Sequence, residues 1–232
     1  MSGKTGWTLG IETSTREGGI ALAFAGEVRE SRSLGPVSQR HAQTLFVEID
    51  RLTKQHGLKP FDLSCIAVSI GPGSFTGLRI GVVAAKTLAY ALKCELKPID
   101  TFLAVAERSQ IDVTSLTVIG DAQRGDLFVG RYRRDERSNW QRESDIEIVN
   151  LAVFLAGISE TETVSGPGVT RYEQEIGQRC HLTEPGLRMP VAEAVCRLAS
   201  REDIASTDFW SLEPFYLRKS AAEEKWEQTH SE

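Results

Sequence analysis

A glycine-rich turn between an apolar run and a helical pattern is the first candidate for chemistry. It lies within Ser69–Gly81 and holds the candidate residues Gly71, Gly73, Ser74, Thr76 and Gly77. Free backbone N–H groups at the start of a helix favour a phosphate or another anion. The pattern equally fits a tight turn in which Ser74 or Thr76 caps the helix. The turn matches neither common nucleotide-binding motif, because no Lys-Ser/Thr pair follows the last glycine and the glycines are out of step with GxGxxG.

Polar residues at two hairpins form a second candidate. Glu12, Thr13 and Ser14 follow an apolar run near the N-terminus, and Asp121 and Arg124 occupy the comparable place in the second half of the chain. An acid and hydroxyl groups beside a cleft are suited to a nucleotide. The Asp-x-x-Arg-Gly sequence is also ordinary hairpin chemistry, so a purely structural role stays open.

Residue types that bind metals are scattered along the chain. Its four histidines form no HxxxH or HExxH pair, and its four cysteines form no CxxC pair. His41 stands alone near the start of an amphipathic helical pattern, where a histidine is usually structural. The sequence therefore predicts no metal site and no catalytic residue, and it favours reduced cysteines, of which Cys65 and Cys196 belong to the core.

Composition narrows the class of protein. The chain has 232 residues, 41% hydrophobic and 25% charged, with a formal net charge of -5. These values are typical of globular proteins and argue against a chain that wraps nucleic acid alone, which needs a concentrated Lys/Arg face. We find no signal peptide and no unbroken apolar run long enough for a membrane span, so a cytoplasmic location without membrane contact is expected.

Hydrophobic periodicity predicts an α/β protein built from two similar halves. In the first half, strands are expected over 8–12, 19–24, 28–33, 65–70 and 96–99. Helices are expected over 39–56, from the end of the glycine turn 71–77 to about residue 92, and over 102–109. In the second half, strands are expected over 116–121, 126–132, 146–149 and 163–165, and helices over 151–156, 171–178 and 191–199. We therefore expect an N-terminal lobe, 1–108, a smaller C-terminal lobe, 109–218, and a polar tail, 219–232.

Small residues recur every fourth position in the helix that follows the glycine turn. Gly77, Gly81, Ala85 and Ala89 form a nearly smooth stripe. Such a stripe lets another backbone approach closely, and that backbone can belong to the chain's own sheet or to another subunit. Spacing alone favours the internal arrangement. The external arrangement predicts that Gly81→Leu blocks complex formation and leaves the monomer folded.

Several motifs, in order along nearly the whole chain, resemble the TsaB branch of the TsaB/TsaD family of tRNA-modification proteins. The motifs are Gly10–Ser14, Arg40–Gln43, Gly71–Gly81 with Ala84–Ala89, Asp121–Gly125, Ser165–Gly168 and Pro214–Arg218, the last resembling that family's closing strand. The glycine turn is specific to the wider family. Each of the other motifs is weak by itself.

The resemblance implies an actin-like, Hsp70-like ATPase fold with ribonuclease H-like duplicated lobes, the second one reduced. In such ATPases an acid and a glycine-rich hydroxyl turn surround the phosphates. Here Gly18 and Gly19 come too late in the sequence, so Glu12, Thr13, Ser14, Asp121 and Arg124 are expected to form a vestigial nucleotide cleft, and the glycine turn a vestigial phosphate site.

The resemblance also implies a non-catalytic subunit. It would bind and activate TsaD, which transfers threonylcarbamoyl from its adenylate to the adenosine next to the tRNA anticodon. TsaD-like chains carry an HxxxH metal motif where this chain has Asp100–Val105 without histidine. The chain itself would need no cofactor: ATP and metal are expected on TsaD, TsaE is a further partner, and tRNA is contacted only through the complex.

The first two long helices of the family's N-terminal lobe contact TsaD, or a second copy of the same chain when TsaD is absent. The resemblance therefore implies an interface of this kind here. The residues expected in it are His41, Leu45, Gly77, Gly81, Ala85 and Ala89.

Three other functions stay open at this point. An active ATPase or kinase of the same fold would use Glu12 and Asp121 as its carboxylates. A metallopeptidase would need the histidine pair that the sequence lacks. A binding module without any link to tRNA is compatible with every motif above.

Overall fold

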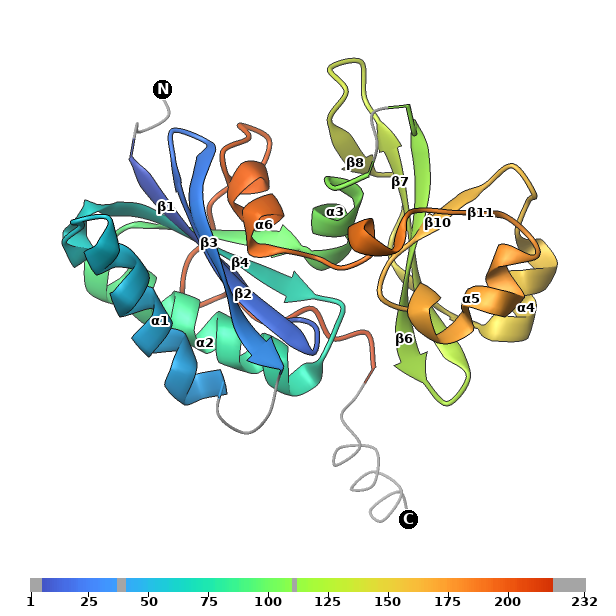
Figure 1. Ribbon diagram of the computed structural model, residues 1–232, viewed down its shortest axis with the longest axis horizontal. Coiled ribbons are helices and arrows are strands. Elements are labelled where there is room, and N and C mark those ends of the chain that lie inside the picture. The colour runs from blue at the N-terminus through green and yellow to red at the C-terminus, as the bar shows by residue number, and fades with distance from the viewer. Residues whose placement is uncertain (1–5, 37–40, 110–111, 219–232) are drawn as a thin grey trace, which may run out of the picture.

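The computed structural model describes residues 6–36, 41–109 and 112–218 of the chain. It contains two sheets side by side, each with helices packed against it (Figure 1). The N-terminal half of the sequence builds the first sheet, and residues from Ser115 onward build the second. The two expected passes of strands and helices are therefore present.

The first sheet is mixed, with strand order β3-β2-β1-β4-β5. Its strands are β1 (Trp7–Glu12), β2 (Glu17–Phe24), β3 (Glu27–Pro36), β4 (Leu63–Gly71) and β5 (Glu95–Asp100). The helices of this half are α1 (His41–Gln55), η1 (Pro60–Asp62), α2 (Phe75–Leu92) and α3 (Thr101–Ala106). β1 pairs antiparallel with β2, with which it forms a hairpin, and parallel with β4. The parallel pair is joined by a crossover connection that contains α1.

The second sheet repeats this arrangement in order β11-β10-β6-β7-β8, with β9 also on β7. Its strands are β6 (Ser115–Gln123), β7 (Asp126–Arg134), β8 (Trp140–Arg142), β9 (Glu147–Asn150), β10 (Thr163–Ser165) and β11 (His181–Leu182). The helices are α4 (Leu151–Gly157), α5 (Val169–Gly177), η2 (Pro185–Leu187) and α6 (Ala192–Ala199). The shared strand order confirms the predicted duplication, and the short β10 and β11 make the second copy the smaller.

Alternation along β2 separates the two faces of the first sheet. Ile20 and Leu22 join the apolar cluster shared with α1 and α2. Ala21 and Ala23 face the other way, toward Cys196 of α6. The larger side chains fill the space beneath two long helices, whereas the small ones let α6 approach the strands closely.

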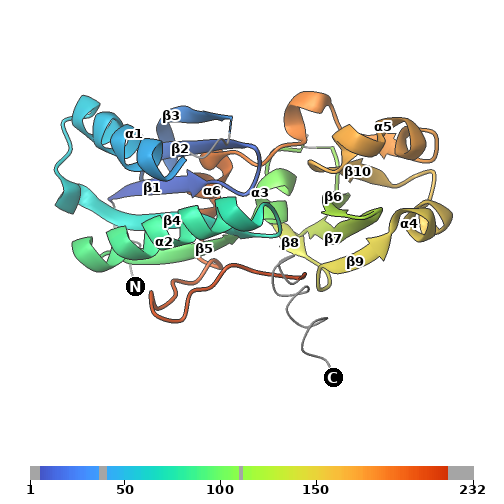
Figure 2. The ribbon, with the colours of Figure 1, turned by 90° about the horizontal axis from the view of Figure 1, so that it is seen from below.

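Helix α6 comes from the second half of the sequence but returns to the first sheet (Figures 1 and 2). A Cβ on Gly10 of β1 would lie 2.6 Å from the Cys196 Sγ of α6, so the glycine permits this contact. The boundary between the two lobes, at residues 108 and 109, stays a prediction. It assigns α6 to the C-terminal lobe, although α6 packs against the first sheet.

The described residues depart from the predicted strands in three places, at β8, at β11 and at residues 214–218. Strands β8 and β11 were not expected, and each has at most three residues, too few for a readable alternation. The tail 219–232 and residues 37–40 at the expected start of α1 lie outside the described residues. Residues 214–218 form no strand, because only one backbone bond, from Phe215 N to Ile70 O at 2.7 Å, ties them to the first sheet.

Helix α2 is long and apolar enough to cross a bilayer by length and composition alone, contrary to our expectation that no segment would be. Its residues Val82, Ala85 and Ala89 belong to the core beneath the first sheet. The core helix of a globular protein passes the same test, so the finding is weak evidence for a span.

Candidate functional site

A cavity of about 670 Å³ lies between the two halves of the molecule. The glycine turn, the β1–β2 turn, the β6–β7 hairpin and the C-terminal segment all contribute to its lining. Of the predicted site residues, it brings together Ser14, Gly73, Ser74, Thr76 and Asp121. Glu12, Thr13, Gly71, Gly77 and Arg124 are not among the residues that line it.

Ser74 is the N-cap of α2. Its side chain accepts a hydrogen bond from Gly77 N at 3.3 Å, and its own N–H donates to Ser14 O at 2.6 Å. Two backbone donors at the start of the helix are therefore satisfied within the chain and are not free for a phosphate. The capping interpretation of the turn holds for Ser74, whereas Thr76 is exposed toward the cavity.

The glycines of this turn allow the β1–β2 turn to lie directly on it. A Cβ on Gly73 would be 2.4 Å from Ser14 O, and a Cβ on Gly77 would be 1.9 Å from Thr13 O. No side chain fits at such distances. Gly71 adopts φ +125°, a backbone conformation that favours glycine. Contact with the chain's own backbone thus accounts for these glycines.

Glu12 lies beneath the cleft at the end of β1 and is only 1% exposed. Its Oε1 accepts hydrogen bonds from Ser14 N at 2.6 Å and Ser14 Oγ at 2.5 Å. Burial raises the pKa of this carboxyl above its usual range, and hydrogen bonds from the side chains of Ser14 and Ser69 and from Ser14 N oppose that effect. The Oε2 atom has no hydrogen-bond partner among the described residues.

Asp121 is already engaged on the other side of the cavity. Its Oδ1 accepts from Gln123 N at 2.8 Å, and its Oδ2 accepts from Arg171 Nη1 at 2.6 Å. This pairing raises the pKa of Arg171. Arg124 sits at φ +56° in the β6–β7 turn. The carboxylate therefore holds a hairpin to α5, as the structural interpretation of this motif expects.

The C-terminal segment, residues 207–218, runs from the first sheet across to the β6–β7 hairpin (Figure 2). Arg218 Nη2 lies 2.6 Å from Asp126 Oδ2, and Arg218 also donates to the carbonyl of Ala122. The pKa of Asp126 is lowered, chiefly by the hydrogen bond from Arg218. This segment, named the strap below, forms one wall of the cavity through Phe215 and its neighbours.

Asp100 and α3 form the stretch where the resemblance to TsaD-like chains would place a histidine pair. The Asp100 carboxylate caps α3 through Phe102 N at 2.8 Å and accepts the hydroxyl of Tyr132 at 2.8 Å. Burial raises the pKa of Asp100. Every residue of α3 is buried. This stretch is a capped core helix.

The small-residue stripe of α2 faces the chain's own sheet, which corrects the expected interface. Gly77 and Gly81 contact Thr13, and Ala85 and Ala89 are fully buried in the core. Leu45 of α1 is fully buried as well. Such residues cannot meet a partner while the monomer is folded. His41 begins α1, but its side chain lies outside the described part of the structure.

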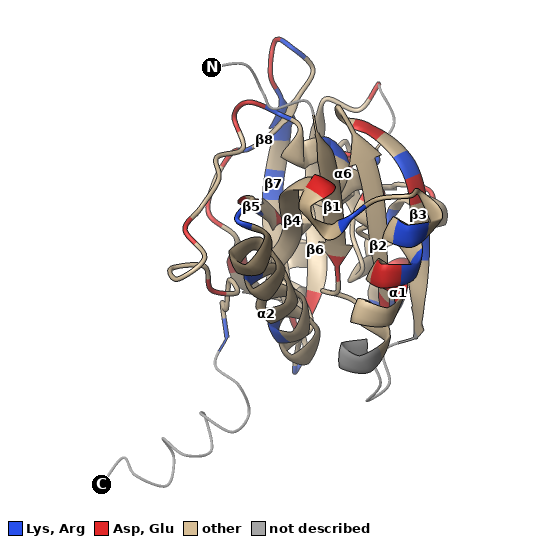
Figure 3. Cartoon of the chain, turned by 90° about the vertical axis from the view of Figure 1, so that its left-hand side faces the viewer, with Lys and Arg blue, Asp and Glu red and all other residues tan. Residues whose placement is uncertain are grey.

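The opposite sides of α1 and α2 expose large apolar side chains instead. Phe46 and Val47 on α1 are 44% and 46% exposed, and Val83 and Tyr90 on α2 are 62% and 59% exposed. We call these four residues the outer face. Figure 3 shows α2 on this side of the molecule with few charged residues. Tyr90 also contacts Phe209, with ring centroids 5.2 Å apart, and exposed Trp210, at 5.9 Å.

Sequence reasoning missed the outer face, although a signal was present. Helix α2 carries only Arg79 and Lys86 as charged residues. A helix that is apolar all round requires cover on both sides. The small residues indicated only the inner side of α2, and no role was predicted for its outer side.

Cysteine chemistry has no support in the structure. All four cysteines are free, and burial raises the pKa of both Cys65 and Cys196 to about 12. Both thiols therefore stay protonated at neutral pH. Both side chains are buried, which confirms them as core residues. Within the described ranges, no three His, Cys, Asp or Glu side chains are placed to hold a metal ion.

Comparison with known proteins places these observations in a family. The model of the family described as TsaD, tRNA N6-adenosine threonylcarbamoyltransferase, matches residues 35–207. The tRNA threonylcarbamoyladenosine biosynthesis protein TsaB of Bacillus subtilis is 28% identical over 229 residues, 94% of this chain and 96% of its own length. The TsaB of Escherichia coli is 25% identical, with the same coverage.

A solved structure shares the fold. YeaZ from Pseudomonas aeruginosa aligns with a TM-score of 0.75 at 22% identity, and the alignment covers 91% of this chain and 100% of that one. The duplicated sheets have the actin-like ATPase architecture that the motifs predicted.

Proposed function

Since the chain belongs to the TsaD family, we propose that it acts in tRNA threonylcarbamoyladenosine biosynthesis as a non-catalytic subunit that binds and activates TsaD. The relatives that match over nearly their whole length are TsaB proteins. A catalytic relative, the TsaD of Thermus thermophilus, matches over only 100 residues, 31% of its own length. That contrast supports a partner role over a transferase.

The observation that carries the proposal is the outer face. Val83 and Tyr90 are exposed to water on a helix with few charged residues. Covering these side chains with a partner removes apolar surface from water, which favours binding. Phe46 and Val47 on α1 extend the same apolar character to the neighbouring helix. TsaD docks here in our proposal, and a second copy of the chain covers the same residues when TsaD is absent.

The cleft supports a docking role in a different way. Ser74 N and Gly77 N, which an ATPase would direct at phosphate, bond within the chain. Asp121 is paired with Arg171. ATP and metal therefore bind TsaD in our proposal, TsaE joins the complex, and tRNA is contacted through the assembly in the cytoplasm.

Val83→Glu tests the interface. Burying a carboxylate against an apolar partner is costly, so we expect affinity for TsaD to fall at least about tenfold. The monomer should keep its melting temperature, because Val83 is mostly exposed. Titration calorimetry with purified TsaD measures the first quantity, and differential scanning calorimetry the second.

Val153→Glu is the matched control, because Val153 of α4 is 63% exposed and lies outside the outer face. It should bind TsaD like the unmodified chain. Equal affinity for Val83→Glu and Val153→Glu would contradict docking through the outer face. Reconstitution of tRNA modification with TsaD, TsaE and the threonylcarbamoyl-AMP synthase, with and without this chain, then tests whether binding activates TsaD.

A further inference from the structure

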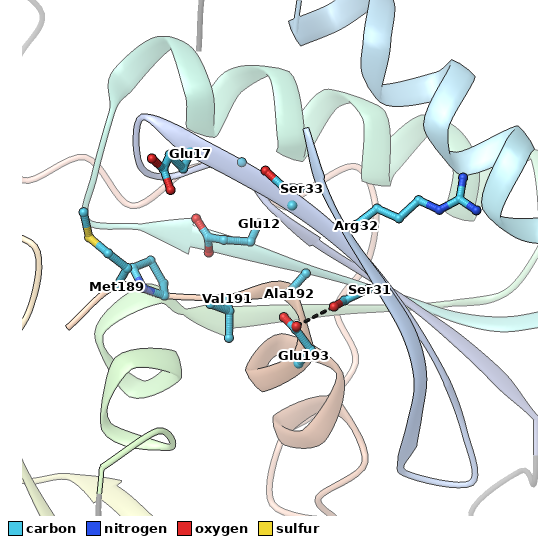
Figure 4. A pocket seen from close by; sticks show the side chains of 12 residues that line it. Glu12, Glu17, Ser31, Arg32, Ser33, Met189, Val191, Ala192 and Glu193 are labelled. Carbon is cyan, nitrogen blue, oxygen red and sulfur yellow. Dashed lines mark hydrogen bonds between the residues drawn. The ribbon is translucent and has the colours of Figure 1, made fainter. Parts of the chain in front are cut away.

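The two faces of the first sheet offer different surfaces to a partner. On the face that carries α6, the carboxylates of Glu12, Glu17 and Glu193 line a cavity of about 270 Å³ (Figure 4). The other face carries α1 and α2, and the apolar outer face lies on these two helices. Charged residues are depleted at the centre of protein interfaces, so the side of α1 and α2 is better suited to docking.

The outer face is too small to hold a partner by itself. It consists of four residues, whereas a stable interface takes about 20–30 residues from each protein. The docking surface must therefore extend beyond α2 on one side or the other. Figures 2 and 3 show the two directions, with α1 on one side of α2 and the strap on the other.

On the α1 side the surface becomes charged. One helical turn after Phe46 and Val47 come Asp50 and Arg51, and Lys54 follows. Lys54 Nζ lies 2.8 Å from Asp50 Oδ2, Arg51 is also in an ion pair, and all three side chains are mostly exposed. A partner that covered these groups would remove their charges from water, which costs free energy. Extension along α1 is therefore unfavourable.

On the strap side the surface stays apolar. The ring centroid of Phe209 lies 5.2 Å from that of Tyr90 and 5.2 Å from that of Trp210, and the last two are 5.9 Å apart. We call these three residues the aromatic cluster. Trp210 is 75% exposed. Since Tyr90 belongs to both groups, the aromatic cluster continues the outer face onto the strap.

The strap holds Trp210 in position without a partner. Asp208 Oδ2 accepts hydrogen bonds from Trp210 N and Ser211 N, both at 3.2 Å. Leu212 is buried in the core, and Lys86 Nζ of α2 donates to its carbonyl at 2.9 Å. A segment that is already fixed loses little conformational entropy on binding. Tryptophan is also enriched among the few residues that carry most of the binding energy of an interface.

We propose that the aromatic cluster is part of the surface that docks TsaD, and that the indole of Trp210 packs into an apolar recess of TsaD. This inference rests on the proposed function, because the outer face supplies the partner. The strap then contributes to partner binding as well as to the wall of the cleft.

Trp210→Ala tests the proposal in titration calorimetry with purified TsaD. The affinity should fall at least tenfold, because the variant loses the indole that fills the recess. Trp210→Phe keeps an aromatic ring and should lose less than threefold. Both variants should fold, because Trp210 is mostly exposed, and differential scanning calorimetry checks this.

Tyr216→Ala is the matched control. Tyr216 is an exposed aromatic residue of the same strap, but it stacks on Phe75 at the opposite end of α2, with ring centroids 4.6 Å apart. This variant should bind TsaD like the unmodified chain. A loss as large as that of Trp210→Ala would mean that any damage to the strap weakens binding, and it would overturn the proposal.

Fluorine NMR tests for direct contact. In a full chain labelled with 5-fluorotryptophan, the signal that is missing from Trp210→Phe belongs to Trp210. Unlabelled TsaD should shift this signal and reduce its H₂O/D₂O solvent isotope shift at least twofold, because TsaD shields the indole from water. Trp140 is fully buried in the core, and its signal should stay unchanged. A Trp210 signal that keeps its solvent isotope shift in the saturated complex would overturn the proposal.

Comparison with Val83→Glu separates this inference from the proposed function. If Val83→Glu weakens TsaD binding and Trp210→Ala does not, docking through the outer face stands and the aromatic cluster has no part in it. If neither variant weakens binding, the proposed docking surface fails together with this inference. Sedimentation velocity covers a second copy as the occupant: weaker self-association of Trp210→Ala with unchanged TsaD affinity would also overturn the proposal.

Discussion

Glu12 shows how one residue can be placed correctly by sequence and yet differ in role from its motif. It ends β1 beside the hydroxyl turn, as expected for a phosphate-binding hairpin. Burial then raises the pKa of its carboxyl, and Ser14 donates two hydrogen bonds to one of its oxygens. At this scale the carboxyl bonds to its own β1–β2 turn.

The raised pKa predicts how Glu12→Gln changes stability with pH. The folded state binds the Glu12 proton more tightly than the unfolded state, so the contribution of this group is full below the unfolded pKa and is lost as pH rises through the folded pKa. Glutamine does not titrate. We therefore expect Glu12→Gln to melt higher than the unmodified chain at pH 8, with the difference vanishing near pH 4.

Thermal unfolding of both proteins from pH 4 to 8 in amine-free buffer measures this difference. Glu17→Gln is the control and should melt close to the unmodified chain, because Glu17 is exposed. A Glu12→Gln protein that melts lower at pH 8 would mean that the ionised carboxylate stabilises the fold in spite of its burial.

At the scale of elements, helix α2 is fitted to the β1–β2 turn through two glycines. The Cβ of an alanine at Gly77 would collide with a backbone oxygen, Thr13 O, whereas one at Gly81 would meet the Thr13 side-chain oxygen at 2.2 Å. A backbone atom cannot rotate away, but a side chain can. The two positions should therefore respond differently to the same substitution.

We expect Gly77→Ala to destabilise the chain by about 1–3 kcal/mol, the usual cost of overpacking, in spite of the better helix propensity of alanine. Gly81→Ala should cost less, and Thr13→Ala should relieve most of that cost by removing Oγ1. Urea unfolding of the single and double variants measures the coupling. Additive effects of Gly81→Ala and Thr13→Ala would contradict this contact. Gly81→Leu should unfold the monomer rather than spare it.

At the scale of the molecule, the strap links the two sheets. Thr207 N donates to Leu96 O at 2.8 Å, Lys86 Nζ to Leu212 O at 2.9 Å, and Arg218 reaches Asp126 of β7. One segment thus contacts β5, α2 and the second sheet in turn. The position of the second sheet relative to the first therefore depends on Arg218, the last residue of the strap, as well as on α3 and α6.

Arg218→Ala should loosen the β6–β7 hairpin without melting the first sheet. We expect amide hydrogen exchange in residues 122–128 to quicken at least about tenfold, while β1 and β4 keep their protection, because local opening needs little buried surface to be lost. The effect should fade at acid pH, since Asp126 has a lowered pKa and its contribution is lost as it protonates.

Arg16→Ala is the matched control, because Arg16 is an exposed arginine that lines the same cleft. Its exchange pattern should equal that of the unmodified chain. Unchanged exchange of the hairpin in Arg218→Ala would show that the strap does not hold the second sheet.

The order of elements was readable from the sequence because periodicity and turn residues are local properties. The β1–β2–β3 meander, the long α2 and the repeated order in the second half all followed from spacing, whereas the choice of Ser74 over Thr76 as the cap of α2 did not. The short strands β8 and β11 and the unpaired path of residues 214–218 did not, because two or three residues carry no period and pairing depends on distant strands.

Local pattern also determined which residues of α2 are small, but not which side of the helix they face. Only the tertiary structure decided that Gly77 and Gly81 meet Thr13, and that Val83 and Tyr90 remain exposed. The same holds for Glu12, whose residue type is given by the sequence but whose burial is decided by the tertiary structure. Burial depends on contacts between residues far apart in sequence, and spacing within one element cannot encode them.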